Sequence, residues 1–74
     1  MDFGEALREI KKGNMALRNG WNGKGMFVFL QPGYIDTDTH MNHTPYLMIR
    51  SVDGSFTPWI CSQTDVLAED WGLV

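Results

Sequence analysis

Apolar residues recur with a helical period at the start of the chain. They occupy positions i, i+3, i+4 and i+7, as Phe3, Ala6, Leu7 and Ile10. This spacing predicts an amphipathic helix whose apolar face must pack on another element, because a helix of about ten residues is unstable alone. Asp2 and Glu5 have the spacing of a capping box, and Gly13 fits the left-handed position that follows a helix.

Two strands are predicted next, on either side of a glycine-rich turn. Residues 15–21 alternate weakly between apolar and polar positions, and residues 26–30 are apolar on both faces. Asn22-Gly23 lies between them and is typical of a tight hairpin turn, because both residues tolerate positive φ. A strand that is apolar on both faces indicates burial by the helix on one side and by a partner chain on the other.

The polar middle of the chain, residues 34–44, is predicted to be a surface loop. It contains side chains of metal-ligating type, namely Asp36, Asp38, His40 and His43. Their spacing matches no known set of metal ligands, so a solvated loop is preferred over a metal site.

A second hairpin and a helical turn complete the pattern. Residues 45–50 and 55–60 are predicted strands, and Asp53-Gly54 between them indicates a turn. Ser62 and Asp65 again have capping-box spacing, which predicts a helical turn over residues 63–68. Residues 71–74 are expected to form a closing strand or an extended tail.

The predicted fold class is α+β, with an N-terminal helix on a small antiparallel sheet of four to five strands and a short helical turn near the C-terminus. Residues 1–74 form one domain, because no linker or repeat divides them. A domain this short buries only about 60% of its unfolded surface, yet 12% of its residues are aromatic and five are methionine. One cysteine cannot form an internal disulfide, so we expect a homo-oligomer, with a tetramer the first choice.

Charge and composition exclude several classes of partner. A net charge of −3 and a pI near 5.0 argue against binding of duplex nucleic acid, which needs a basic face. No apolar run approaches about 20 residues, so no membrane span is expected. The single cysteine and the charged residues 1–15 favour the cytoplasm. A small anionic ligand stays compatible, because a pocket can be locally positive.

The glycine-rich stretch contains candidate ligand-binding groups. Trp21 offers a flat face for a base, and its neighbours Gly20 and Gly23 are expected to leave that face open. Exposed backbone N–H groups of the turn, together with Lys24, could hold a diphosphate. A purely structural hairpin explains the same residues, because such turns need glycine and asparagine for their geometry. Trp59 and Trp71 are instead expected in the core.

Catalytic chemistry is not indicated. No nucleophile lies close to a base in the sequence, and Cys61 has no basic neighbour. We therefore expect a protein that is not an enzyme and needs no cofactor or metal.

Three longer stretches are recognisable as motifs. They are MDFGEAL at residues 1–7, GWNGKGMF at residues 20–27, and an ending with TPW at residues 57–59 and SQTDVLAEDW at residues 62–71. With these motifs the chain resembles the second family of Thoeris anti-defence proteins, found in phages and prophages. The resemblance covers both ends of the chain and misses mainly residues 34–43.

The resemblance implies a non-enzymatic sponge that sequesters cyclic ADP-ribose isomers made by bacterial TIR-domain enzymes. Some members of the family are associated with cyclic oligonucleotides. It also implies a homotetramer with ligand pockets between protomers. The matching motifs, with Arg18 added as a second cation, give the candidate binding residues Arg18, Trp21, Asn22, Gly23, Lys24, Met26, Gln63, Thr64 and Asp65.

Each main candidate has an expected role. Trp21 would stack on a base, Lys24 or Arg18 would bind phosphate, and Asp65 would accept hydrogen bonds from ribose hydroxyls. Two alternatives come from other classes of protein. One is an oligomeric interaction module whose exposed aromatics bind a host protein, and the other is an enzyme that cleaves nucleotides.

Overall fold

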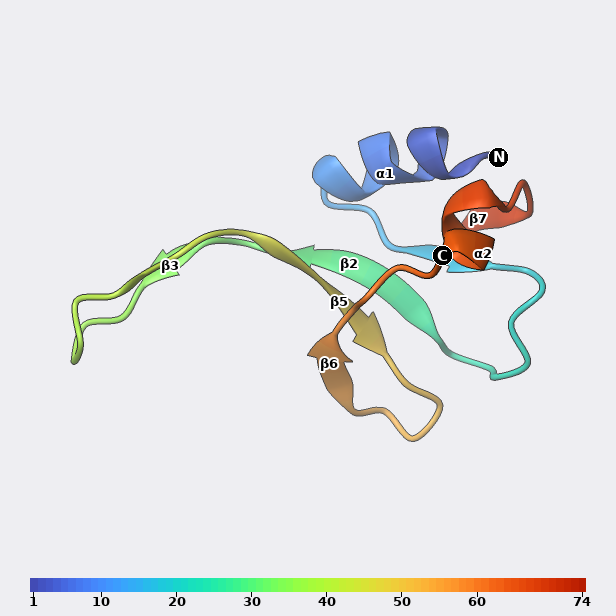
Figure 1. The fold of residues 1–74 in the computed structure, drawn as a ribbon. Helices are drawn as coiled ribbons and strands as arrows, with labels where there is room; N and C mark the ends of the chain where they lie inside the picture. The colour runs from blue at the N-terminus through green and yellow to red at the C-terminus, as the bar shows by residue number, and fades with distance from the viewer.

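A five-stranded antiparallel sheet with one long helix on its face forms the body of the protein, in a computed structural model that describes residues 1–74 (Figure 1). The strand order is β6-β5-β2-β1-β7. The helix is α1, Phe3–Lys11, and the strands are β1 (Ala16–Arg18), β2 (Phe27–Gln31), β5 (Tyr46–Arg50), β6 (Phe56–Pro58) and β7 (Trp71–Leu73). The α+β prediction is confirmed.

Helix α1 forms as its sequence pattern predicts. Asp2 Oδ1 accepts a hydrogen bond of 2.8 Å from the backbone N–H of Glu5, which caps the first turn. Gly13, with a φ of 101°, follows the C-terminal end of the helix. On the face toward the sheet, Ala6 and Ile10 are fully buried.

The core between helix and sheet is thin. Only five of the 74 residues are buried: Ala6, Ile10, Ala16, Val28 and Trp71. They come from α1, β1, β2 and β7, so each of these elements depends on the others for its apolar contacts. Trp71 therefore lies in the core as predicted, whereas Trp59 is only partly buried against it.

The tight hairpin predicted at Asn22-Gly23 is wrong. Strand β1 ends at Arg18 and β2 begins at Phe27, so residues 19–26 form a longer loop in which Gly25 alone has a positive φ, of 77°. After Arg18 the chain stays beside β7, because the backbone N–H of Asn19 donates to the Asp70 carbonyl oxygen at 3.1 Å and that of Gly20 donates to Asp70 Oδ2 at 2.7 Å. A contact with a distant part of the chain thus overrides the local turn preference.

The C-terminal half follows its prediction more closely. Strands β5 and β6 pair around Asp53-Gly54, where Gly54 has a φ of 87°. Helix α2, Gln63–Leu67, begins where Ser62 Oγ accepts a hydrogen bond from the Asp65 backbone N–H at 3.1 Å. Residues 71–73 form the closing strand, β7, which pairs with β1. No helix has the length and apolar character needed to cross a membrane.

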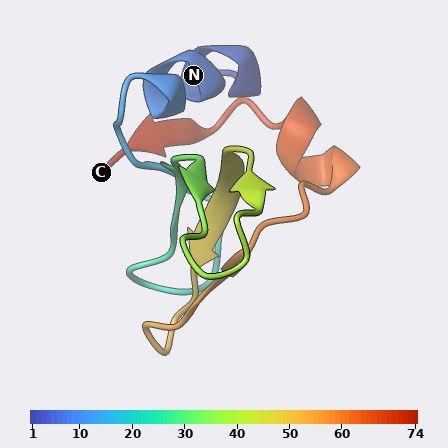
Figure 2. The ribbon, with the colours of Figure 1, turned by 90° about the vertical axis from the view of Figure 1, so that its left-hand side faces the viewer.

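Residues 34–44 are not a loop, contrary to the prediction. Strands β3 (Tyr34–Ile35) and β4 (Asn42–His43) pair and extend the β2–β5 hairpin into an arm, defined here as residues 32–45 (Figures 1 and 2). The Tyr34 and His43 rings stack with centroids 4.3 Å apart. The arm explains a radius of gyration of 13.3 Å, where about 11 Å is expected for this length.

Candidate functional site

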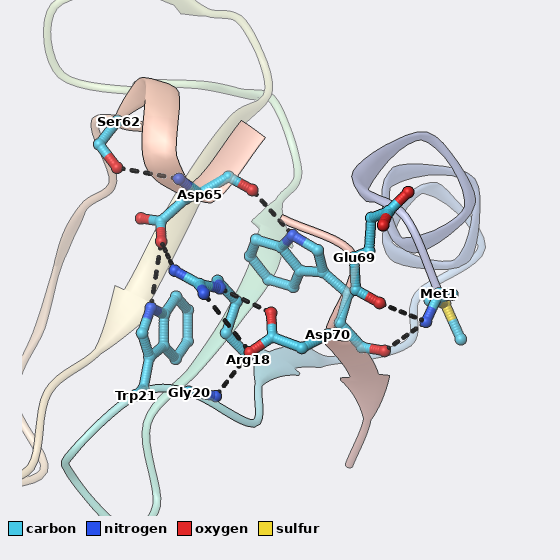
Figure 3. A network of polar contacts seen from close by, with 9 residues as sticks. Met1, Arg18, Gly20, Trp21, Ser62, Asp65, Glu69 and Asp70 are labelled. Carbon is cyan, nitrogen blue, oxygen red and sulfur yellow. Dashed lines mark hydrogen bonds and ion pairs between the residues drawn. The ribbon is translucent and has the colours of Figure 1, made fainter. Parts of the chain in front are cut away.

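The side chain of Arg18 joins two aspartates from the C-terminal part of the chain (Figure 3). Its Nε donates to Asp70 Oδ1 at 2.8 Å, and its Nη1 donates to Asp65 Oδ1 at 2.9 Å. The Arg18 and Asp65 side chains are only 18% and 16% exposed. Their ion pair is therefore screened less by salt than a surface pair.

The strand pairing brings these residues together. In the β1–β7 register Arg18 lies opposite Trp71, so Asp70 falls beside the end of β1. Asp65 lies in the first turn of α2, which precedes β7. Arg18 and its two aspartates therefore connect β1, α2 and the start of β7.

Trp21 completes this group, which we call the arginine cluster (Arg18, Trp21, Asp65 and Asp70). Its Nε1 donates to Asp65 Oδ1 at 3.2 Å, and its ring meets that of Trp71 edge-on with centroids 5.4 Å apart. Trp71 Nε1 in turn donates to the Asp65 carbonyl oxygen at 2.9 Å. Trp21 is thus half-buried against the core, with its orientation fixed by a hydrogen bond.

Gly20 is required for the close approach of the loop to Asp70. Its backbone N–H donates to Asp70 Oδ2 at 2.7 Å. A Cβ atom at this position would lie 2.8 Å from the same oxygen. A larger residue would therefore push the start of the loop away from the cluster.

The remaining candidate residues take no part in the hydrogen bonds of the arginine cluster. Gln63 and Thr64 are exposed in the turn of α2 that holds Asp65. Asn22, Gly23, Lys24 and Met26 lie along the loop, and Gly23 packs against Val52 of the β5–β6 turn. Of the nine predicted residues, the structure joins Arg18, Trp21 and Asp65 directly.

Sequence reasoning missed Asp70 as a site residue. The signal for it was indirect, because an acid just before a closing strand acquires its partner only through the β1–β7 register. The same end of β7 is held by the amino group of Met1, which donates to the Trp71 carbonyl oxygen at 2.9 Å. No three side chains of metal-ligating type gather in residues 1–74.

Ion pairing shifts the protonation of the cluster. The hydrogen bond from Arg18 is the main cause that lowers the pKa of Asp70, and the N–H of Gly20 adds to it. Asp70, followed by Asp65, raises the pKa of Arg18 in return. The cluster consequently holds one cation between two carboxylates.

The fold and the cluster define a small α+β domain with a tryptophan, arginine and aspartate site beside its edge strand. Residues 1–74 match the family described as Thoeris anti-defense 2-like domain. Thoeris anti-defense 2 of Bacillus phage SP01 is 40% identical over an alignment of 87 residues. The alignment covers 100% of this chain and 94% of that protein. The chain belongs to the Thoeris anti-defense 2-like family, as its motifs predicted, and this supports a role in phage anti-defence.

Acid should weaken the fold through Asp70. Because the folded-state pKa of Asp70 is lowered, the unfolded chain binds the proton more tightly. The stabilisation is therefore present above the unfolded pKa of about 3.9 and is lost as the pH falls through the folded value. We expect Asp70→Asn to lower Tm at pH 7 and to show a smaller further loss on acidification.

Thermal melting from pH 7 to pH 2.5 checks this. The pKa of Asp53 is also lowered, mainly by the backbone N–H of Ser55. Asp53 therefore gives the wild type and Asp70→Asn the same additional loss of stability in acid. The difference between the two curves therefore isolates Asp70. Parallel curves for the wild type and Asp70→Asn would contradict the assignment.

Proposed function

We propose that the protein is a sponge that binds cyclic nucleotide immune signals and sequesters them without cleaving them. Cyclic ADP-ribose isomers made by TIR-domain enzymes are the first candidates, and cyclic oligonucleotides are the second. Membership in a phage anti-defence family supports this function. The proposed place of action is the host cytoplasm, where such signals would be made.

One observation at the site carries the proposal. Asp65 uses Oδ1 for both Arg18 and Trp21, whereas its Oδ2 accepts no hydrogen bond within the chain. A fixed carboxylate with one free oxygen, held beside an indole ring, suits a nucleoside, which offers hydroxyl donors and a flat base. Thr64 and Gln63 add exposed polar groups next to it.

The affinity that a sponge needs requires more than these contacts. A nanomolar dissociation constant corresponds to about 12 kcal/mol, whereas stacking contributes about 1–3 kcal/mol per base. The single chain has one hollow, over α1, and it is lined by Met1, Glu5, Arg8, Glu9 and Lys12. None of the candidate residues lines it. We therefore propose that a second protomer packs over the ligand at Trp21 and buries it.

Uncovered apolar surface supports a homotetramer with two-fold interfaces. In β2, Phe27 and Phe29 alternate with buried Val28 and so lie on the sheet face that α1 does not cover. Phe56 on β6 packs edge-on against Phe29 and is still 52% exposed. On the arm, Ile35 is 66% exposed. Association would bury both surfaces.

The chemistry around Cys61 supports binding rather than catalysis. Burial is the first cause that raises the pKa of the Cys61 thiol, which makes it a weaker nucleophile at neutral pH. Its Sγ lies 3.6 Å from the Ser62 carbonyl oxygen, an acceptor that cannot activate it. The two histidines, the usual general bases for a thiol, are His40 and His43, and both lie on the arm.

A host-protein-binding module is the second candidate function. The exposed apolar residues of the arm, Ile35 and Met41, favour it, since such patches often mark interaction surfaces. Pull-down from a host lysate, with and without cyclic nucleotide, separates the two functions. Specific capture of one host protein by a chain that binds no nucleotide would favour the module.

Calorimetric titration tests the sponge directly. We expect cyclic ADP-ribose isomers or cyclic dinucleotides to bind at micromolar protein with a dissociation constant in the nanomolar range or below. Mass spectrometry of the ligand after heating the complex should recover it unchanged. Absence of binding would remove the proposal for those ligands, and recovery of a cleaved product would indicate an enzyme.

Trp21→Ala should weaken ligand binding by about ten- to a hundredfold, because a stacked base is worth about 1–3 kcal/mol. Trp59→Ala is the matched control, because Trp59 is also half-buried and also contacts Trp71 edge-on, at 5.9 Å. Both variants should lower Tm, yet only Trp21→Ala should lower affinity. An equal loss of affinity in both would show that general destabilisation is the cause.

Light scattering at micromolar concentration tests the assembly. We expect the mass of a tetramer, four times the 8.4 kDa of the chain. Phe56→Lys, on the exposed sheet face, should reduce that mass because it places a second positive charge opposite Arg50 in the proposed interface. A monomeric mass for the wild type would contradict the proposal.

A further inference from the structure

The arginine cluster is poorly suited to bind phosphate. Arg18 is paired with both Asp65 and Asp70, so the formal charge of the cluster is negative. A phosphate placed there would face two carboxylates and would have to compete for donors already in use. If the ligand contains phosphate, its anionic part requires another location.

Free cations occur at the other end of the same loop. Arg50, the last residue of β5, lies within 4 Å of no carboxylate, and its Nη1 donates to the Gly25 carbonyl oxygen at 2.8 Å. Lys24, the residue before Gly25, is exposed and also unpaired. Every other Lys or Arg of the chain, apart from Arg18, lies on α1 or at its C-terminal end.

Unused backbone donors lie beside these two cations. The N–H groups of residues 22–25 donate to no acceptor in the chain. Gly25 has a φ of 77°, which turns the backbone sharply next to Arg50. The adjacent acid, Asp53, is engaged by the backbone N–H and hydroxyl of Ser55 at 2.9 and 2.7 Å. Successive free N–H groups next to a guanidinium are typical of phosphate sites.

We propose that Arg50, Lys24 and the N–H groups of residues 22–25 form the phosphate subsite of the ligand site. The proposal rests on the proposed function for the identity of the ligand, which would place its base on Trp21 and its phosphates here. Trp21 and Lys24 are three residues apart, so their Cα atoms are at most about 11 Å apart. One ligand can therefore reach both. Arg50 was absent from the residues predicted by sequence.

Inorganic pyrophosphate tests the subsite without any nucleotide. In ¹⁵N NMR titrations of the full chain, we expect it to shift the amides of residues 22–25 and the Arg50 Nε signal. Arg50→Gln and Lys24→Gln should each weaken binding about tenfold or more, because each removes a charged donor. Arg8→Gln, which removes the same charge from an exposed position on α1, should leave the affinity unchanged.

Two results would overturn the subsite. One is equal weakening by Arg8→Gln, which would indicate general attraction to positive charge, and the other is unchanged affinity in Lys24→Gln. Lys24→Gln is decisive if Arg50→Gln disturbs the loop, because Lys24 makes no side-chain hydrogen bond or ion pair that the loop needs.

Titration of the same variants with cyclic ADP-ribose isomers separates this proposal from the proposed function. Pyrophosphate binding without cyclic nucleotide binding would keep the subsite and remove the sponge. Cyclic nucleotide binding that is unchanged in Arg50→Gln and Lys24→Gln would keep the sponge and remove the subsite.

Discussion

The paired guanidinium of Arg18 is the interaction on which the candidate site depends. It joins β1 to α2 and to the start of β7, and it does so with charge-assisted hydrogen bonds to Asp65 and Asp70. Those bonds fix the Asp65 carboxylate, which accepts a hydrogen bond from the indole N–H of Trp21. Asp70 at the same time holds the backbone of Gly20. Removing the guanidinium would leave two partly buried carboxylates without their counter-charge, and the loop would lose its anchor.

The thin core increases the importance of this polar link. With five residues buried, apolar packing contributes little beyond the contact between α1 and the sheet. The edge strand β7 is held by three residue pairs with β1, by the Met1 amino group and by the arginine cluster. The same contacts that position the site therefore also close the sheet. The geometry of the candidate site and the stability of the fold are consequently coupled, so each variant that tests the proposed binding needs a matched stability control.

Local sequence signals predicted the elements whose causes are local. The caps at Asp2 and Ser62, the apolar face of α1 and the turn at Asp53-Gly54 all form as predicted. The prediction of a tight turn at Asn22-Gly23 was wrong because Asp70, far along the chain, accepts hydrogen bonds from the backbone N–H groups of Asn19 and Gly20. The arm was predicted as a loop because its polar composition conceals a continuation of the β2–β5 pairing, visible only through the register Gln31↔Tyr46.

The candidate site was predictable only in part, because it too depends on contacts between distant parts of the chain. Trp21 and Asp65 were found through motifs, and the structure joins them by a hydrogen bond. The partners of Arg18 could not be predicted, because they follow from the pairing of the first strand with the last. Arg50 was equally hidden, since only the fold brings the end of β5 to Gly25. Long-range strand pairing thus decides which charged residues are neutralised and which stay free.

The resulting charge distribution gives the loop of residues 19–26 two different ends. Carboxylates and an indole lie at its start, and unpaired cations with free N–H groups lie at its end. A nucleotide has the matching asymmetry, with hydroxyl and base donors at one end and phosphates at the other. For the proposed ligand, this complementarity would offer specificity that neither end alone provides.

A crystal structure of the protein with a bound cyclic ADP-ribose isomer tests this account most directly. We expect the base against Trp21, a ribose hydroxyl on Asp65 Oδ2, the phosphates beside Lys24 and Arg50, and Arg18 still paired with Asp70. Ligand bound elsewhere, over α1 or on the arm, with the arginine cluster and the loop unchanged, would contradict it.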